Sequence, residues 1–435
     1  MLINFRVKNY RSFRDEAILD LEAAGLKEYN ESLIPFKKNM YLPIVALYGK
    51  NGGGKSNLIR AFWLGVQFIR NAQRTQHEKA EIPVRAFELD DYSRELPTEF
   101  EFIYVYKGIK YEYGFASVKK HIVKEYLYSA PKGKKALIFS REYQNFSFPE
   151  DKEKSKKELL KEAVGVNQLF FSVACVMNYQ PCIEAMGWFR NDIYFSRDFV
   201  DIDSNIIEYQ EDSQMLQSIV STAKIADVGI ADMKFDINNM EIRDLDNISK
   251  DVNDDIKQSI SRALVQMKKA LESDPNVAEG KLSVNEIKTT SYHIGVDRNG
   301  NQGFFTLGLG DESDGTRKLM AIAPAIEKAV QSGGIIVIDD IERELHPLLV
   351  EYIINRFQNP ENNKNAAQLI FTTHSTEIMS REMLRRDQIY FVDKDRKTGA
   401  SNLYSLSDFS PRKDENIYKA YILGKYGAIP HIEED

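Results

Sequence analysis

Gly49-Lys50-Asn51-Gly52-Gly53-Gly54-Lys55-Ser56 matches the phosphate-binding loop pattern G-x-x-x-x-G-K-[ST]. The apolar run of residues 43–48 before this loop predicts a strand. Apolar residues at helical spacing after the loop predict a helix that continues to about Gln73. Glycines between a strand and a helix let backbone N–H groups converge on phosphate oxygens. The stretch therefore indicates a nucleotide site rather than a chance glycine-rich turn.

Two side chains of this loop carry chemistry of their own. Lys55 is expected to reach the β- and γ-phosphates of ATP, and the Ser56 hydroxyl is placed to ligand Mg²⁺. The helix that follows directs its positive N-terminal end at the same anion. We therefore predict ATP and Mg²⁺ as cofactors. The predicted nucleotide-binding set consists of the loop residues 49–56 together with Asn57 and Arg11.

Composition places the chain among ordinary globular proteins. It has 435 residues, of which 43% are hydrophobic and 28% are charged, enough for about two to three domains. No segment approaches the roughly 18 consecutive apolar residues of a membrane span, and residues 1–6 lack the apolar core of a signal peptide. We therefore expect a cytoplasmic protein. Cys175 and Cys182 are too few for a zinc site and are expected to be core thiols.

The formal net charge of −7 argues against a surface that is mainly a nucleic-acid-binding one. Period-two patterns predict strands at residues 2–10 and 19–21 and an antiparallel meander over about 98–148. We expect helices at 152–163 and 168–175, mainly helical structure over 204–283, and strands again from 283 to 309 with a hairpin turn at 296–301. A stripe of apolar residues favours one helix within the helical region: Ile256, Ile260, Ala263, Leu264, Met267 and Leu271.

The continuous β-branched run Ile335-Ile336-Val337-Ile338 ends in Asp339 and Asp340. A run that is apolar on both faces is typical of a central parallel strand. Ligands bind at the carboxyl ends of such strands, so one carboxylate is expected to hold Mg²⁺ and the other to orient or deprotonate the attacking water. The alternative is that both acids only cap the next helix.

Residues 369–375 form a second buried-strand run, which ends in His374. A single histidine is more often structural, but its position at a strand end beside the predicted nucleotide favours a γ-phosphate sensor. His346, at the start of the next helix after the acidic pair, is expected to be structural. The turn at residues 309–316 contains Ser313 and Gly315 and precedes a helix, which indicates either a second anion site or an ordinary helix cap.

These segments, in this order, resemble the ABC-type ATPase heads of the SMC and RecF class. They resemble more closely the compact AAA-family, OLD-like ATPases of bacterial phage-defence operons, such as RloA and the ATPase subunits of the Septu and PARIS systems. The resemblance covers nearly the whole chain, from residues 7–13 through the loop and the segment 338–347 to the tail at 424–430. It implies an α/β fold: an ABC-ATPase-like P-loop head with a mixed sheet, an antiparallel meander and an inserted helical subdomain. The expected domains are 1–203, 204–285 and 286–435.

The resemblance also implies roles for single residues. Ser313 and Gly315 would form the ABC signature, which contacts the γ-phosphate bound to the opposite subunit. Asp339 would be the Walker B metal ligand and His374 the switch histidine. The expected active state is an ATP-sandwiched dimer.

The chain departs from the family pattern after the Walker B aspartate, where Asp340 replaces a glutamate. Its carboxylate is one methylene shorter, and small misplacements can cost on the order of a hundredfold in rate. Glu342 lies nearby in sequence but is expected to point elsewhere unless the turn is unusual. We therefore predict an ATPase that binds ATP and hydrolyses it slowly.

The function implied by the resemblance is that of an ATPase subunit of an antiphage defence or toxin–antitoxin-like system. It would act as a homodimer or a higher even-numbered oligomer and would control a separate effector protein, a nuclease. No membrane partner is expected. Two alternatives remain open. One is a DNA-repair or recombination ATPase of RecF or SMC type, which would bind nucleic acid; the other is an ATP-bound scaffold with little hydrolysis.

Overall fold

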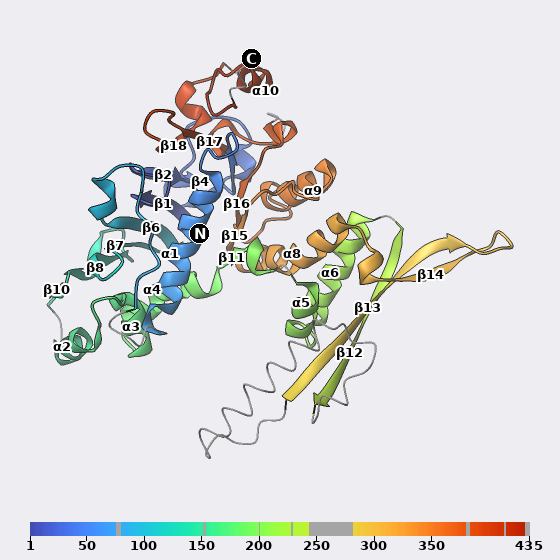
Figure 1. Ribbon diagram of the computed structural model, residues 1–435, viewed down its shortest axis with the longest axis horizontal. Coiled ribbons are helices and arrows are strands. Elements are labelled where there is room, and N and C mark those ends of the chain that lie inside the picture. The colour runs from blue at the N-terminus through green and yellow to red at the C-terminus, as the bar shows by residue number, and fades with distance from the viewer. Residues whose placement is uncertain are drawn as a thin grey trace. The chain divides into compact units, whose positions relative to one another are not determined.

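The computed structural model describes residues 1–74, 80–150, 154–199, 201–227, 229–242, 282–379, 383–412 and 415–430. The chain divides into two compact units. The first comprises Met1–Val200 and Ile322–Asp435, and the second comprises Asp201–Ala321. The second unit is thus inserted in the sequence of the first. The helices and strands of both units are labelled in Figure 1.

A six-stranded sheet in the first unit carries the phosphate-binding loop. Its strand order is β11-β15-β16-β5-β17-β18, and only β18 runs antiparallel to its neighbour. The predicted central strands at 43–48, 335–338 and 369–372 are confirmed, and all three are buried. The strands span β5 (Ile44–Tyr48), β11 (Ile193–Phe195), β15 (Ile335–Ile338), β16 (Gln368–Thr372), β17 (Ile389–Lys394) and β18 (Ser401–Ser405).

The pairing register aligns the carboxyl ends of β15, β16 and β5. Leu47 lies opposite Thr372, and Phe371 lies opposite Ile338. Because β15, β16 and β5 are parallel, the residues that follow each strand emerge at the same edge of the sheet. This edge carries the loop, the acidic pair and the histidine.

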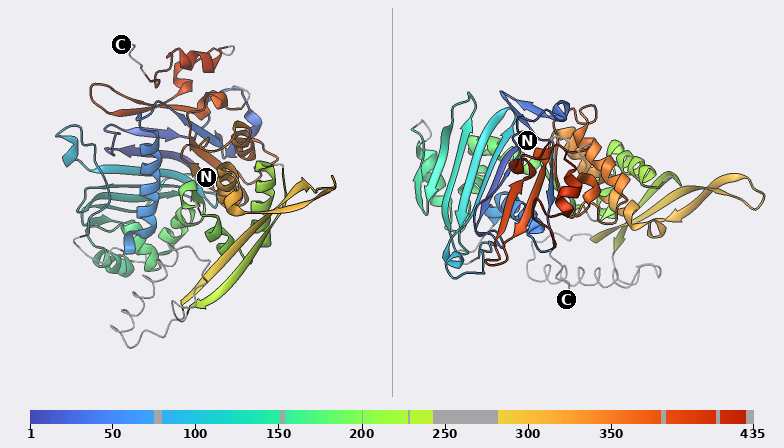
Figure 2. Two further views of the ribbon diagram at one scale, coloured as in Figure 1. Left: turned by 45° about the vertical axis from the view of Figure 1, so that its right-hand side comes forward. Right: turned by 90° about the horizontal axis from the view of Figure 1, so that it is seen from above.

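A seven-stranded antiparallel sheet is the other layer of the first unit, and it confirms the predicted meander. Its strand order is β10-β9-β8-β7-β6-β1-β2. Figure 2 shows its blue to teal strands side by side in the right-hand view. The strands span β1 (Leu2–Lys8), β2 (Ala17–Asp20), β6 (Thr98–Tyr106), β7 (Ile109–Ser117), β8 (Ile122–Ala130), β9 (Ala136–Glu142) and β10 (Asn145–Ser147), and a separate hairpin comprises β3 (Ile34–Phe36) and β4 (Asn39–Tyr41).

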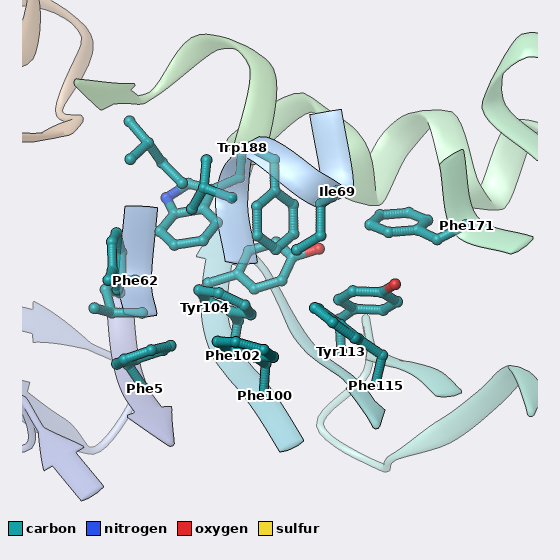
Figure 3. Packing of buried hydrophobic residues seen from close by; sticks show 14 of the residues in the cluster. Phe5, Phe62, Ile69, Phe100, Phe102, Tyr104, Tyr113, Phe115, Phe171 and Trp188 are labelled. Atoms are coloured by element: carbon teal, nitrogen blue, oxygen red, sulfur yellow. The ribbon is translucent and has the colours of Figure 1, made fainter. Parts of the chain in front are cut away.

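Aromatic side chains join this sheet to the helices that cover it (Figure 3). Phe62, from the helix after the loop, lies 4.9 Å from Phe5 and 5.6 Å from Phe102, measured between ring centroids. Trp188 stacks on Tyr104 at 4.5 Å. The aromatics of the meander thus serve the core, as cross-strand and interlayer pairs. The helices of the first unit are α1 (Lys55–Asn71), α2 (Lys154–Ala163), α3 (Phe170–Val176), α4 (Gln180–Asn191), α9 (Pro347–Gln358) and α10 (Ile417–Ile422).

Cys175 and Cys182 are buried free thiols of α3 and α4, as predicted. Burial raises the pKa of the Cys175 thiol to about 12, so this side chain stays protonated and unreactive at neutral pH. Among the helices of the described ranges, none combines the length and apolar character that a membrane span requires.

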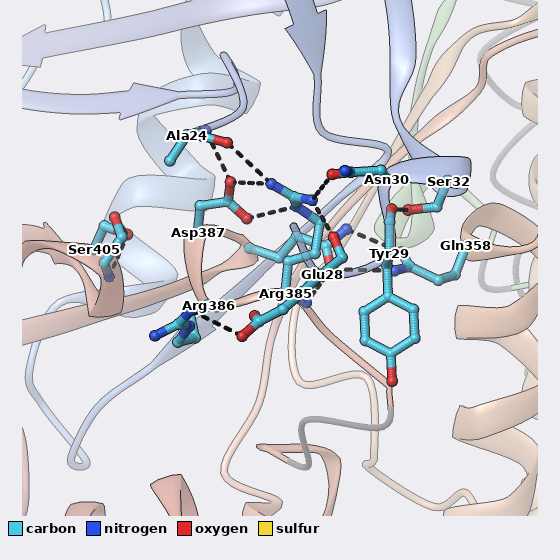
Figure 4. A network of polar contacts seen from close by, with 12 residues as sticks. Ala24, Glu28, Tyr29, Asn30, Ser32, Gln358, Arg385, Arg386, Asp387 and Ser405 are labelled. Atoms are coloured by element: carbon cyan, nitrogen blue, oxygen red, sulfur yellow. Dashed lines mark hydrogen bonds and ion pairs between the residues drawn. The ribbon is translucent and has the colours of Figure 1, made fainter. Parts of the chain in front are cut away.

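A buried arginine fixes the start of β17 (Figure 4). The guanidinium of Arg385 is 2.9 and 2.8 Å from the two carboxylate oxygens of Asp387, and it also donates to the carbonyl of Ala24 at 3.2 Å and to Asn30 Oδ1 at 3.1 Å. Asp387 in turn accepts from the backbone N–H of Ala24 at 2.8 Å. These bonds tie residues 24–30 to the segment that enters β17.

The second unit contains more strand than the sequence pattern indicates. Two helices, α5 (Ile202–Glu208) and α6 (Ser213–Ala226), are followed by a three-stranded antiparallel sheet of β12 (Ile230–Ile242), β13 (Leu282–Val296) and β14 (Gln302–Gly308). Strand β12 lies within the range expected to be mainly helical. Its residues Lys234, Phe235, Asp236 and Ile237 alternate polar and apolar side chains, a period-two signal that the sequence analysis missed.

The predicted hairpin at 296–301 is confirmed: Asp297 N–H donates to the carbonyl of Asn301 at 2.9 Å. Helix α8 (Asp314–Ser332) begins in the second unit and continues into the first. The predicted apolar stripe from Ile256 to Leu271 lies outside the described residues.

A buried ion pair within the antiparallel sheet also bonds to the start of α3. Glu125 of β8 accepts from the N–H groups of Phe170 and Phe171 at 2.8 and 2.9 Å and from the Tyr113 hydroxyl at 2.9 Å, and lies 3.6 Å from Arg141 Nη1. Glu125 and Arg141 are both almost fully buried. Burial raises the pKa of Glu125, against the opposing effects of Arg141 and the bonded N–H groups. The carboxylate therefore caps α3 and neutralises a buried guanidinium.

We expect Glu125→Ala to lower the free energy of unfolding by about 3–5 kcal/mol, because it leaves Arg141 buried without its counter-charge. Urea denaturation measures the change. Glu112→Ala is the matched control, since Glu112 pairs with Lys135 at the partly exposed surface of the same sheet and should cost about 1 kcal/mol or less. Equal losses for the two variants would contradict the role assigned to the buried pair.

Candidate nucleotide site

The phosphate-binding loop is held against strands β17 and β18. Gly49 and Gly54 have φ angles of 149° and 123°, which favour glycine. A Cβ atom on Gly49 would lie 2.2 Å from the carbonyl oxygen of Val392, and one on Gly54 would lie 2.4 Å from Ser401 Oγ. Ser401 Oγ also donates to the carbonyl of Gly53 at 2.6 Å. The absence of a Cβ at these glycines therefore lets the loop pack closely against β17 and β18, in addition to leaving room for a phosphate.

Lys55 begins α1 and points back across the loop. Its Nζ donates to the carbonyl of Gly49 at 2.7 Å and lies 3.0 Å from Nε2 of His374. Burial lowers the pKa of Lys55, and the charges of Asp340, Glu342 and Asp339 oppose this shift. The negative charges of the site thus favour the ammonium form of the lysine that is predicted to bind the phosphates.

Ser56 and Asp339 meet at the ends of α1 and β15. The Ser56 hydroxyl donates to Asp339 Oδ1 at 3.2 Å, and the Thr372 hydroxyl donates to the same oxygen at 2.7 Å. A hydroxyl and a carboxylate side by side are hard oxygen ligands of the kind that Mg²⁺ takes, together with waters and substrate phosphates. The two residues predicted to hold the metal therefore lie together, and the donor set fits magnesium.

Asp340 makes a tight turn after β15. Its φ is 51°, in the left-handed region that Asp tolerates better than most residues. Its N–H donates to the Thr372 hydroxyl at 2.7 Å, and its Oδ1 lies 4.0 Å from Nε2 of His374. The side chain is 42% exposed. Asp340 and His374 are thus neighbours at the open side of the site.

The turn after Asp340 is unusual, the one case in which Glu342 is expected to turn toward the site. The Glu342 carboxylate Oε1 accepts a hydrogen bond from the backbone N–H of His374. The reason is the turn: Asp340 and Glu344 both have left-handed φ angles, 51° and 65°. They fold the segment between them back along the end of β16, where Ile341 N–H donates to the carbonyl of Thr372 at 3.0 Å.

Residues near the N-terminus buttress the loop from a second side. Asn57 Nδ2 donates to the Ser12 hydroxyl at 2.9 Å, and Ser401 N–H donates to the Ser12 carbonyl at 2.6 Å. Arg11 has a left-handed φ of 50°, and its Nε donates to the Tyr10 hydroxyl at 3.2 Å. Asn57 therefore bonds to a residue that supports the loop. The contacts described for Arg11 are with Tyr10 and Arg85, so its role in ATP binding stays a prediction. Ser12 lies within the segment 7–13 that carries the family resemblance but was not among the predicted site residues, and no local motif marks Ser401.

Of the remaining loop residues, Lys50 pairs with Asp393 of β17, with 2.9 Å between Nζ and Oδ1. Asn51 and Gly52 are exposed. The loop thus has a side bound to β17 and a side open to solvent.

Ser313 and Gly315 belong to the second unit. Ser313 Oγ accepts from the N–H of Thr316 at 3.1 Å, the geometry of a helix N-cap for α8. Within one chain, the Ser313 hydroxyl therefore acts as a helix cap. Its contact with the nucleotide of an opposite subunit stays a prediction. His346 is likewise a cap: its Nδ1 accepts from the N–H of Leu348 at 3.2 Å at the start of α9.

We expect Gly49→Ala to weaken ATP binding by more than tenfold and to lower the melting temperature, because its Cβ would displace the backbone of β17. Gly52→Ala is the matched control: its φ of 74° costs about 1 kcal/mol for a side chain, but nothing lies within 4 Å of the added atom. Titration with a fluorescent ATP analogue and a melting curve measure both effects. Similar behaviour of the two variants would show that the contact with Val392 does not hold the loop.

Comparison with known proteins gives one family match. The family model described as "AAA domain, putative AbiEii toxin, Type IV TA system" matches residues 44–380, well over half of the chain. No curated protein matches the chain.

Similar solved structures include an SMC head domain from Thermotoga maritima, with 13% identity, 93% of this chain and 98% of that chain covered and a TM-score of 0.37. The recombination mediator RecF with ATPγS has 12% identity, 93% and 98% coverage and a TM-score of 0.36. At such identities and TM-scores these likenesses carry no argument about this chain. The family match is sufficient by itself: the chain belongs to this family of AAA ATPase domains.

Proposed function

We propose that the chain binds ATP with Mg²⁺ and hydrolyses it slowly, as one subunit of a homodimer or a higher even-numbered oligomer. One observation carries the proposal. Lys55 Nζ lies 3.0 Å from His374 Nε2, and Ser56 Oγ lies 3.2 Å from Asp339 Oδ1. Four residues singled out separately for phosphate, metal and γ-phosphate recognition thus converge at one sheet edge.

Ser56 and Asp339 would hold the magnesium ion, which when bound neutralises charge on the phosphates. Lys55 binds the phosphates as an ammonium donor, with its position set by the Gly49 carbonyl. Asp340 accepts a proton or a hydrogen bond from the attacking water. Its shorter side chain and its turn conformation support a slow rather than a fast reaction.

The proposed cellular role draws on the family match. The matching family description names a toxin of a type IV toxin–antitoxin system. Together with the resemblance to phage-defence ATPases, this supports an antiphage or toxin–antitoxin-like role in which ATP controls how the oligomer holds a separate nuclease effector. The alternative of a RecF- or SMC-type DNA-repair ATPase rests on the same motifs, and DNA-stimulated ATP turnover would favour it.

We expect ATP and Mg²⁺ to convert the purified chain from monomer to an even-numbered oligomer, measured as mass by light scattering. Lys55→Ala should weaken ATP affinity roughly 10- to 100-fold, because a hydrogen bond to a charged group is lost, and should abolish the mass change. Asp340→Ala should retain the mass change while phosphate release falls. A mass indifferent to nucleotide, with no phosphate release, would instead support the scaffold alternative.

Asp340→Glu tests the proposed cause of slow hydrolysis. The longer side chain restores the reach of the carboxylate, so we expect phosphate release to rise about tenfold with ATP affinity unchanged. Single-turnover phosphate release measures the rate. Asp408→Glu is a control at a distant Asp, which caps a short helix. No gain for Asp340→Glu would mean that the missing methylene does not limit the rate.

A further inference from the structure

Glu342 lies in a segment whose shape is unusual. Two residues with left-handed φ, Asp340 and Glu344, bracket it. Backbone bonds hold the turn between them: Arg343 N–H donates to the carbonyl of Asp340 at 3.0 Å, and Leu345 N–H donates to that of Glu342 at 3.0 Å. Strained conformations of this kind persist where the surrounding structure requires them, and they cluster at functional sites.

The strained turn places the Glu342 carboxylate at the end of β16. Oε1 accepts from the backbone N–H of His374. This is the one hydrogen bond described for the His374 N–H. The bond is made to the backbone of His374. It therefore fixes the position of the His374 backbone but leaves the side-chain rotamer of the ring free.

The His374 ring is itself part of the nucleotide site. Its Nε2 lies 3.0 Å from Lys55 Nζ and 4.0 Å from Asp340 Oδ1. A shift of the His374 backbone would therefore move a group that contacts both the predicted phosphate-binding ammonium and the predicted water-binding carboxylate. Shifts of about 1 Å can cost on the order of a hundredfold in rate.

The second oxygen of Glu342 supports a role beyond packing. Oε2 is buried and has no hydrogen-bond partner among the described residues, although most buried polar atoms are paired. The carboxylate also lies close enough to the end of β5 to act on Tyr48, whose pKa is raised by burial and, secondarily, by the charge of Glu342. A side chain that served only to fill space would not need a charge here.

We infer that Glu342 is a positioning residue of the ATP site, which holds the backbone of His374 and so fixes the ring beside Lys55 and Asp340. The inference rests on the proposed function, since it assigns Glu342 to the same hydrolytic site. It explains why a turn with two strained residues follows the Walker B aspartate in this chain. Asp340 then acts together with a histidine that Glu342 keeps in place.

The contact is tested first, without nucleotide. The chain has 6 histidines, so selective ¹⁵N labelling gives few backbone amide signals. Glu342→Met, which has similar length but no carboxylate, should move the His374 amide signal and speed its hydrogen exchange. Glu342→Gln keeps an acceptor oxygen and should leave the signal near its wild-type position. Glu344→Ala, a glutamate in the same turn that pairs with Arg343, is the control and should not move it.

The role is tested by steady-state ATP turnover of the same variants. Glu342→Met should lower kcat by about 10- to 100-fold with KM changed less than about threefold, and Glu342→Gln should restore most of the activity. In a His374→Ala background, Glu342→Met should lower kcat by less than about twofold, because residues that act through one another are not additive. Melting curves show whether each variant is folded.

Additive losses in the double variant, or equal losses for Glu342→Gln and Glu342→Met, would overturn the inference. So would a His374 amide signal that Glu342→Met leaves unmoved. A wild-type chain that binds ATP but releases no phosphate would overturn the proposed hydrolysis instead. In that case the amide signal, which needs no nucleotide, still decides whether Glu342 holds His374.

Discussion

Backbone hydrogen bonds between the parallel strands β15, β16 and β5 place almost every reactive group of the candidate site. The register sets Leu47 opposite Thr372 and Ile338 opposite Phe371. The loop lies nearly 300 residues before the acidic pair, and His374 lies 34 residues after Asp340, yet each of these groups comes within two residues of the end of one of these strands. All three strands are buried, and a one-residue slip would offset their ends and move these groups out of alignment.

Polar contacts complete the site around this frame. Thr372 illustrates the principle: its hydroxyl donates to Asp339, and it accepts from the N–H of Asp340. Thr372 of β16 thereby fixes the turn that follows the neighbouring strand β15. Behind the loop, the bonds of Arg385 fix the entrance of β17, whose carbonyl at Val392 lies against Gly49. The loop is thus supported from the side of β17 and β18.

Local patterns predicted the parts of this structure that are local. The phosphate-binding loop, the buried strands at 335–338 and 369–372 and the antiparallel meander each follow from spacing that a short window reveals. Ser12 and Ser401 were not predicted as site residues, and the contact of Glu342 with His374 was not predicted, because their partners are 45, 348 and 32 residues away. The backbone angle of Asp340 also leaves no mark in the sequence, and it is this angle that redirects Glu342.

The packing of the glycine loop against Val392 and Ser401 has an energetic consequence. A loop that is free in solution loses conformational entropy when a ligand orders it, and the loss weakens binding. Here the side of the loop that faces β17 and β18 is already fixed by the folded chain. The phosphates would therefore bind to a loop that is already ordered. The conformational entropy of this side of the loop is lost when the chain folds and is not lost again when ATP binds.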